Sequence, residues 1–217
     1  MYTLIVGTQD WSSWSLRPYL ALKATGAKFK LEVIRLRVVP DSKKAILKHS
    51  PSGKVPVLKI GRQAVWDSLA ICETLAERHP KAGLWPKDAG ARAMARAYCA
   101  EMHSGFADIR SQLTMDFARK LPLPKLRPET SEQIARIIAA WEAALKTYGK
   151  KDGFLFGRFS VADCMYAPVV SRFTTYGVKV PKRVASYMEK IWALPGMQEW
   201  LKASQKEVAR GLPTYPV

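Results

Sequence analysis

Three serines near the amino terminus stand where a hydroxyl group could stabilise an anion. Ser12, Ser13 and Ser15 lie between a short apolar run, residues 2–7, and a helical pattern. Because Pro18 is tolerated only in the first turn of a helix, we predict that this helix begins near residues 13–15. A helix N-terminus carries unpaired N–H groups and a partial positive charge, so a serine beside it could hydrogen-bond a bound anion such as a thiolate. The alternative is that one of these serines only caps the helix.

A second polar pair precedes a later helical pattern. Asp67 and Ser68 come just before this pattern, and a serine in a first helical turn can bind an anion together with backbone N–H groups. Asp67 could instead be only the N-cap, which is the commoner role for aspartate. Upstream, Pro56 stands at the start of a short strand, where it removes a ladder donor. A cis bond between Val55 and Pro56 would turn the Val55 peptide groups toward a peptide ligand, but the residue pattern alone does not establish it.

These residues belong to the first part of a chain whose pattern changes near residue 80. Apolar, β-branched or alternating runs predict strands at residues 2–7, 29–36, 57–60 and 63–66. Residues 81–88 contain Pro and Gly and are predicted to form a linker, and helical periods follow, one of them from Met94 to Phe117. Ser160 to Asp163 has the pattern of a helix capping box. The expected fold class is therefore α/β followed by all-α, with domains at residues 1–80 and 89–217.

Composition and charge narrow the possible functions. The 217 residues include 35 Lys and Arg against 18 Asp and Glu, and the net charge of +17 favours anionic ligands. The basic residues are scattered, and the compact cluster of Lys179, Lys182 and Arg183 lacks interleaved aromatic residues, so nucleic acid is not expected as a partner. The three cysteines form no metal-binding pattern, and no apolar run is long enough to span a membrane. We therefore expect a cytoplasmic protein without a metal or a membrane partner.

Four segments, in this order, resemble the cytosolic glutathione S-transferases. They are Ser12-Ser13-Trp14-Ser15-Leu16-Arg17, Lys54-Val55-Pro56-Val57-Leu58, Asp67-Ser68 and the box from Ser160 to Asp163. The resemblance covers nearly the whole chain and is greatest to the serine-type classes zeta and tau. It implies a thioredoxin-like N-terminal domain, a helical-bundle C-terminal domain and, in most members, a homodimer.

The resemblance also implies roles for individual residues. In the serine-type classes the residue that activates the thiol stands five positions before an arginine, and counting back from Arg17 gives Ser12. Ser13 and Ser15 are close enough to hold this catalytic role instead. The resemblance also implies how the co-substrate glutathione is held. Val55 beside Pro56 would hold the cysteinyl part, and Asp67 with Ser68 would hold the γ-glutamyl end. Lys54 would meet the glycyl carboxylate.

The second substrate is expected to bind between the two domains. Trp11, Met102 and Phe106 are candidates to line a site for a small apolar electrophile, although such residues at helical spacing are more often core. The expected function is transfer of glutathione to such electrophiles, in detoxification. The alternatives on the same fold are a glutathione-dependent isomerase like maleylacetoacetate isomerase, and a non-catalytic glutathione-binding or interaction module. Trp14 stands where the zeta pattern carries cysteine, which disfavours a zeta-type isomerase.

Overall fold

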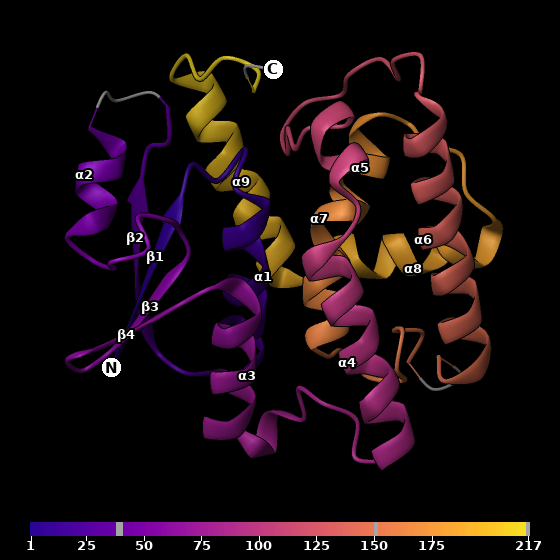
Figure 1. Ribbon diagram of the computed structural model, residues 1–217, viewed down its shortest axis with the longest axis horizontal. Helices are drawn as coiled ribbons and strands as arrows, with labels where there is room; N and C mark the ends of the chain where they lie inside the picture. The colour runs from indigo at the N-terminus through magenta and orange to yellow at the C-terminus, as the bar shows by residue number, and fades with distance from the viewer. Residues whose placement is uncertain (38–40, 150–151, 216–217) are drawn as a thin grey trace.

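The computed structural model describes residues 1–37, 41–149 and 152–215, and within them a sheet-containing half is followed by a helical half (Figure 1). The first half contains β1 Tyr2–Gly7, α1 Ser13–Ala24, β2 Phe29–Ile34, α2 Ser42–Leu47, β3 Val57–Ile60, β4 Gln63–Trp66 and α3 Ser68–Arg78. After a 3-10 turn at Pro80–Ala82, the second half contains α4 Ala89–Ser104, α5 Ala107–Gln112, α6 Pro128–Thr147, α7 Val161–Thr175, α8 Lys182–Trp192 and α9 Pro195–Ala209. The predicted change from α/β to all-α is confirmed.

The strand order β2-β1-β3-β4 places β1 in the interior of the sheet. β1 is parallel to β2 and antiparallel to β3, so Leu4 is in register with Leu31 on one side and Leu58 on the other. A parallel pair needs a crossover connection, which α1 supplies. Leu4, Ile5 and Val6 are all fully buried, which explains why this strand is apolar without alternation.

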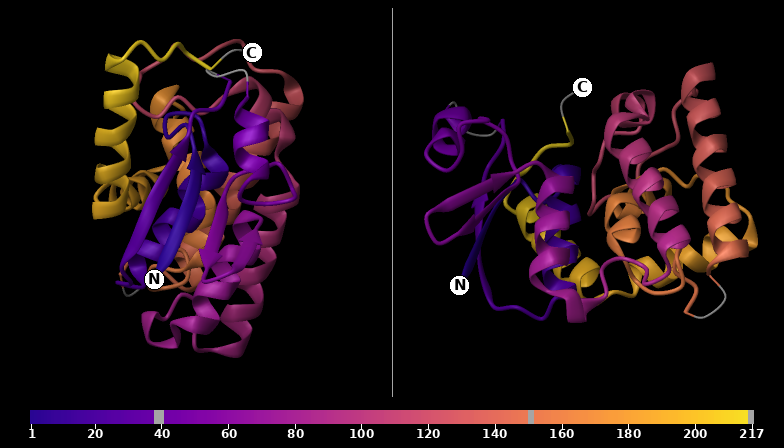
Figure 2. Two further views of the ribbon diagram at one scale, coloured as in Figure 1. Left: turned by 90° about the vertical axis from the view of Figure 1, so that its left-hand side faces the viewer. Right: turned by 60° about the horizontal axis from the view of Figure 1, so that its bottom comes forward.

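Two helices, α1 and α3, pack between the sheet and the helical half. α1 and α3 cover the face of the sheet that is turned toward the helical half, whereas α2 lies on the far side (Figures 1 and 2). α1 also packs against α7, of whose fifteen residues fourteen are buried. On the other side of α7, the rings of Tyr166 and Phe173 each lie 5.6 Å from the ring of Trp141 in α6. One apolar core therefore runs through both halves and holds the start of α1 in place relative to α4.

The helical period predicted from Met94 to Phe117 is interrupted in the structure. α4 ends at residue 104, Phe106 adopts a left-handed conformation with φ of 60°, and only then does the short α5 begin. The guanidinium group of Arg110 donates hydrogen bonds to carbonyl groups at the end of α4 and so satisfies them. Hydrophobic periodicity records which positions are buried and not whether the backbone is continuous, so it does not reveal this break.

The predicted capping box at the start of α7 is confirmed. The Asp163 carboxylate accepts hydrogen bonds from the Ser160 N–H at 2.8 Å, the Ser160 hydroxyl at 3.0 Å and the Leu155 N–H at 3.2 Å. Asp163 is fully buried, and burial raises the pKa of its carboxyl group to about 6. Because its acceptor groups are occupied by the protein itself, this pair serves the fold.

The described residues contain free thiols but no reactive one. Cys72, Cys99 and Cys164 are unpaired and buried, and burial raises the pKa of each thiol, that of Cys72 to about 12. A thiol that remains protonated is a poor nucleophile.

Within the described ranges no helix is long and apolar enough to cross a membrane, and no group of three or more His, Cys, Asp and Glu side chains could hold a metal ion.

Candidate functional site

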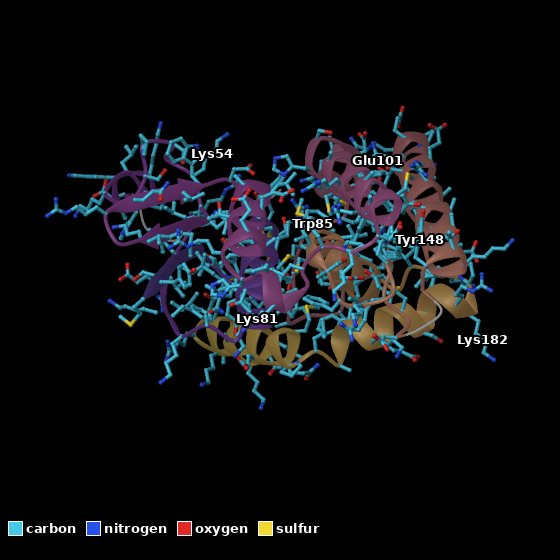
Figure 3. All side chains as sticks on the ribbon, turned by 90° about the horizontal axis from the view of Figure 1, so that it is seen from below. Lys54, Lys81, Trp85, Glu101, Tyr148 and Lys182 are labelled. Atoms are coloured by element: carbon cyan, nitrogen blue, oxygen red, sulfur yellow. The ribbon has the colours of Figure 1, made fainter. Side chains whose placement is uncertain are left out.

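A pocket of about 580 Å³ opens between the sheet-containing half and α4. Figure 3 shows Lys54 of the first half and Glu101 of α4 along the same side of the molecule. The pocket is lined by Trp14, Ser52, Lys54, Val55, Pro56, Trp66, Asp67, Ser68 and His103. The five residues that the resemblance implies for glutathione binding therefore line one pocket, although the chain separates them into two segments.

The segment before β3 forms one wall of this pocket. The ladder between β1 and β3 begins at Val57, so the peptide groups of Val55 lie outside it. The bond between Val55 and Pro56 is cis. The Ser52 hydroxyl accepts a hydrogen bond from the Lys54 N–H at 3.2 Å, and the Lys54 residue is exposed. This wall thus offers backbone groups and one exposed cation.

Asp67 and Ser68 form the wall at the N-terminus of α3. Asp67 caps this helix, because its carboxylate accepts hydrogen bonds from the N–H groups of Leu69 at 2.9 Å and Ala70 at 3.1 Å. Its φ of 76° is strained for a residue other than glycine. Ser68 is 1% exposed, and its buried hydroxyl oxygen has no hydrogen-bond partner within the described residues. A buried hydroxyl without a partner costs free energy, which a ligand in the pocket would recover.

His103 contributes to the pocket from the helical half. Its Nε2 lies 3.1 Å from the Asp67 carboxylate, and its ring meets the Trp14 ring edge-on with centroids 5.4 Å apart. The sequence does not single out this residue, because an isolated histidine in an amphipathic helix carries no motif. Its only signal is its place beside Met102, which we expected to face the other domain.

The three serines lie at the start of α1, but none of them lines the pocket. Ser12 and Ser13 are each 5% exposed and Ser15 is fully buried. Ser12 occupies the N-cap position without a capping hydrogen bond from its side chain. Its hydroxyl instead donates to the Ser15 oxygen at 2.7 Å, and that oxygen also accepts the Gly7 N–H at 3.0 Å. The Ser12 side chain therefore does not cap α1, contrary to the alternative considered for these serines.

Trp14 lines the pocket and contacts two cations that do not line it. The guanidinium carbons of Arg17 and Arg110 lie 4.3 and 4.5 Å from the centre of its ring, both within the range of cation–π contacts. Burial, together with the charges of Arg110 and Arg172, lowers the pKa of Arg17 to about 9. Trp14 is therefore held in place by contacts from both halves of the molecule.

The loop before α1, residues 8–12, is held by the C-terminal helix α9. Glu207 accepts hydrogen bonds from the N–H groups of Gln9 at 3.1 Å and Asp10 at 2.9 Å. The indole N–H of Trp200 donates to the Gln9 carbonyl at 2.6 Å. The buried Asp10 carboxylate accepts the Ala118 N–H at 2.9 Å. Residues nearly two hundred positions away thus determine where Ser12 lies, and nothing near Ser12 in the sequence indicates it.

Arg119 completes this network. It donates to Asp10 at 3.1 Å and to the two Asp116 oxygens at 3.0 and 2.9 Å. Burial and the neighbouring Asp10 raise the pKa of the Asp116 carboxyl group. Two buried carboxylates around one cation tie the loop to the segment that follows α5.

The three residues expected at the electrophile site are all buried. Met102 is 2% and Phe106 7% exposed, and both belong to the apolar core. Trp11 is 6% exposed and meets the ring of Tyr215 edge-on with centroids 5.4 Å apart. None of the three lines the pocket described above, and their role at an electrophile site stays a prediction.

Two family models match parts of both halves of the chain. The family model described as "Glutathione S-transferase, N-terminal domain" matches residues 11–78, and the one described as "Glutathione S-transferase, C-terminal domain" matches residues 124–203. A probable maleylacetoacetate isomerase from Caenorhabditis elegans is 26% identical over 191 residues, which are 81% of this chain and 87% of that protein. A maleylpyruvate isomerase from Ralstonia is 28% identical over 163 residues, 73% of this chain and 77% of that protein.

The fold is also found in solved structures. A glutathione transferase homologue from Burkholderia, solved with bound glutathione, superposes with a TM-score of 0.72 at 24% identity. The superposition covers 94% of this chain and 98% of that one. At this identity the likeness establishes the fold alone.

Proposed function

The chain belongs to the cytosolic glutathione S-transferase family, and from this premise we propose that it activates the thiol of glutathione with Ser12 and transfers it to a small apolar electrophile. Glutathione would lie in the pocket between the sheet-containing half and α4. Its sulfur would lie near the N-terminus of α1, with Ser12 as the hydroxyl donor.

The buried Ser68 hydroxyl is the observation that carries this proposal. It stands in the first turn of α3 without a hydrogen-bond partner among the described residues, beside the cap residue Asp67. A carboxylate of glutathione would meet this hydroxyl and the Ser68 N–H, since the next two N–H groups of α3 donate to Asp67. A glutathione amine would in turn meet the Asp67 carboxylate. Lys54, exposed at the other wall, would meet the second carboxylate.

The energy required is within reach of one serine and one helix end. A free thiol has a pKa of about 8.5, and lowering it by about 2 units takes roughly 2.7 kcal/mol of preference for the thiolate. A hydrogen bond to a charged group contributes about 1.5 to 3 kcal/mol, and an exposed helix N-terminus up to about 1 kcal/mol. Together they suffice, and neither alone is comfortably enough.

A glutathione-dependent isomerase is the second candidate. The observation in its favour is that two relatives sharing more than a quarter of their aligned residues are a probable maleylacetoacetate isomerase and a maleylpyruvate isomerase. An isomerase would use the same pocket and the same thiolate but would return glutathione unchanged. Assays of maleylpyruvate isomerisation and of chloronitrobenzene conjugation, each with and without glutathione, separate the two activities.

We further propose that the protein is a cytoplasmic homodimer with domains at residues 1–80 and 89–217, as in the family that it resembles. Met94 of α4 is 44% exposed. A second copy would cover apolar surface of this kind. Light scattering at several protein concentrations measures the mass directly, and a monomer throughout would contradict the proposal.

The first experiment is a titration of the ultraviolet absorbance of the bound thiolate against pH. We expect a pKa well below that of free glutathione, and a return toward the free value in Ser12→Ala. Tight binding with an unshifted pKa would point to a non-catalytic glutathione-binding module. An unchanged pKa and an unchanged conjugation rate in Ser12→Ala would move the catalytic role to Ser13 or Ser15.

A further inference from the structure

Ser12 and Ser15 form a buried hydroxyl pair whose hydrogen bonding is incomplete. A hydroxyl has one hydrogen to donate and two lone pairs that accept. The Ser15 oxygen accepts twice, from the Ser12 hydroxyl at 2.7 Å and from the Gly7 N–H at 3.0 Å. The hydrogen of Ser15 itself has no acceptor among the described residues, although Ser15 is fully buried. One donor at the site is therefore unused.

The direction of the hydrogen bond between the two serines can reverse without moving either oxygen. Only one hydrogen fits between two oxygens 2.7 Å apart, and either hydroxyl can supply it. If Ser12 turns its hydrogen elsewhere, its oxygen becomes free to accept the Ser15 hydrogen. The Gly7 N–H continues to hold the Ser15 oxygen against the end of β1, so the pair keeps its position.

We propose that Ser15 is a positioning residue for the thiol chemistry: when the Ser12 hydroxyl donates to the sulfur of bound glutathione, the Ser15 hydroxyl donates to Ser12. This inference rests on the proposed function, because it takes Ser12 as the donor to the sulfur. The chain of donors then runs from the Gly7 N–H to Ser15, from Ser15 to Ser12 and from Ser12 to the thiolate. Every group in it is satisfied, and no proton leaves its oxygen.

This chain of hydrogen bonds, called the relay below although no proton is transferred along it, has a chemical consequence. Hydrogen bonds in a chain polarise one another, so a hydroxyl that accepts a hydrogen bond is a stronger donor. Ser15 thereby strengthens the bond from Ser12 to the sulfur and fixes the direction of the Ser12 hydrogen. Ser13 is buried to a similar extent but its hydroxyl makes no hydrogen bond with another described residue, so it has no place in this chain.

The test is a double-mutant cycle with the pKa of the bound glutathione thiol as its readout. Difference spectra with and without glutathione isolate the bound thiolate from the cysteines of the protein. We expect Ser12→Ala to raise this pKa by about 1 to 2 units, the worth of one hydrogen bond to a charged group. Ser15→Ala should raise it by roughly 0.2 to 0.6 unit, which is about a 1.5- to 4-fold change in the ionisation constant, from the lost cooperativity.

The double variant decides whether Ser15 acts through Ser12. If it does, Ser12→Ala with Ser15→Ala has the same thiol pKa as Ser12→Ala alone. Additive shifts, or no shift in Ser15→Ala while Ser12→Ala shifts, overturn the relay and leave the proposed function standing. No shift in Ser12→Ala overturns the assignment of Ser12 in the proposed function, and the relay with it.

Three further variants separate the relay from a general loss of stability. Ser171→Ala removes an equally buried hydroxyl, bonded to the Pro168 carbonyl at 2.8 Å, and should lower the free energy of unfolding without moving the thiol pKa. Ser15→Thr keeps a hydroxyl and should keep the wild-type thiol pKa. Ser15→Cys keeps the volume but replaces the hydroxyl by a weak donor. It should match Ser15→Ala, and it carries the test if Ser15→Ala does not fold. A wild-type thiol pKa in Ser15→Cys contradicts the relay.

Discussion

Helices α3 and α7 both begin with an aspartate and a serine, but the two pairs use their hydrogen-bonding groups differently. Asp163 is fully buried and accepts three hydrogen bonds from Ser160 and Leu155. The Asp67 side chain is 41% exposed, and the hydroxyl of Ser68 has no partner among the described residues. The pair at Asp163 is saturated, meaning that its polar groups are all hydrogen-bonded within the protein, and such a pair stabilises the fold. The pair at Asp67 keeps a buried hydroxyl without a partner, and such a pair can bind a ligand. A buried polar group without a partner therefore distinguishes a site from a cap.

The largest effect is expected at the saturated pair. Asp163→Ala removes the cap and leaves buried N–H groups without an acceptor, which should lower the free energy of unfolding by about 2 to 4 kcal/mol. Asp67→Ala is the matched variant and should cost only about 1 kcal/mol, because its side chain is partly exposed. Urea unfolding of both variants measures the difference. Equal losses would show that the two caps are equivalent.

The saturated pair should also make stability depend on pH. Burial raises the pKa of the Asp163 carboxyl group to about 6, above the unfolded value of about 3.9. A carboxyl group with a raised folded pKa binds more protons in the folded state, so its stabilising contribution is complete below about pH 4 and is lost as pH rises through about 6. Relative to Asp163→Asn, which does not titrate, the wild-type protein should lose roughly 3 kcal/mol of stability between pH 4 and 7. A constant difference between the two proteins over this range would be evidence against a buried, protonatable Asp163.

The unpaired hydroxyl of Ser68 should matter for glutathione binding and not for the stability of the fold. Ser68→Ala is expected to weaken glutathione binding about tenfold or more, since a hydrogen bond to a carboxylate contributes about 1.5 to 3 kcal/mol. The free energy of unfolding should not fall, because the hydroxyl has no partner to lose and its burial without a partner itself costs free energy. Ser160→Ala is the control and should lose stability while glutathione affinity is preserved. Calorimetric titration and urea unfolding of both variants test the contrast, which an unchanged affinity in Ser68→Ala would abolish.

The smallest effect is expected at His103. Its contact with Asp67 is partly exposed, and such pairs contribute about 0 to 1 kcal/mol. His103→Ala should therefore change glutathione affinity by less than about fivefold. A loss as large as that of Ser68→Ala would mean that His103 contacts the ligand and does not merely hold Asp67.

Local chemistry made much of the fold and part of the site predictable. The strands and the cap at Ser160 follow from patterns that span fewer than about ten residues. α1 begins at Ser13, within the predicted range, but Pro18 lies inside the helix and not in its first turn, so the reason for that prediction was wrong. Ser68 is indicated by its place at the start of a helix, whereas Lys54, Val55 and Ser68 could be assigned to one ligand only through the resemblance to the glutathione S-transferases. The break before Phe106 could not be predicted, because burial on both sides of it keeps the same period.

Other features depend on residues that are distant in the sequence. The acceptors that hold the loop of Ser12 come from Glu207 of α9, and the partner of Asp67 comes from α4. No pattern relates these positions, since a contact between segments 36 or nearly 200 residues apart leaves no periodicity in either segment.

The amino-acid sequence by itself determined the order of the strands and the capping box at Ser160, because each depends on neighbours in the chain, and the resemblance supplied the segments that form the pocket. Only the tertiary structure decided that the Ser68 hydroxyl has no partner and that His103 reaches Asp67. These outcomes depend on how two halves of the chain pack around one core, because that packing determines which polar groups outside the local caps find a partner and which remain available for a ligand.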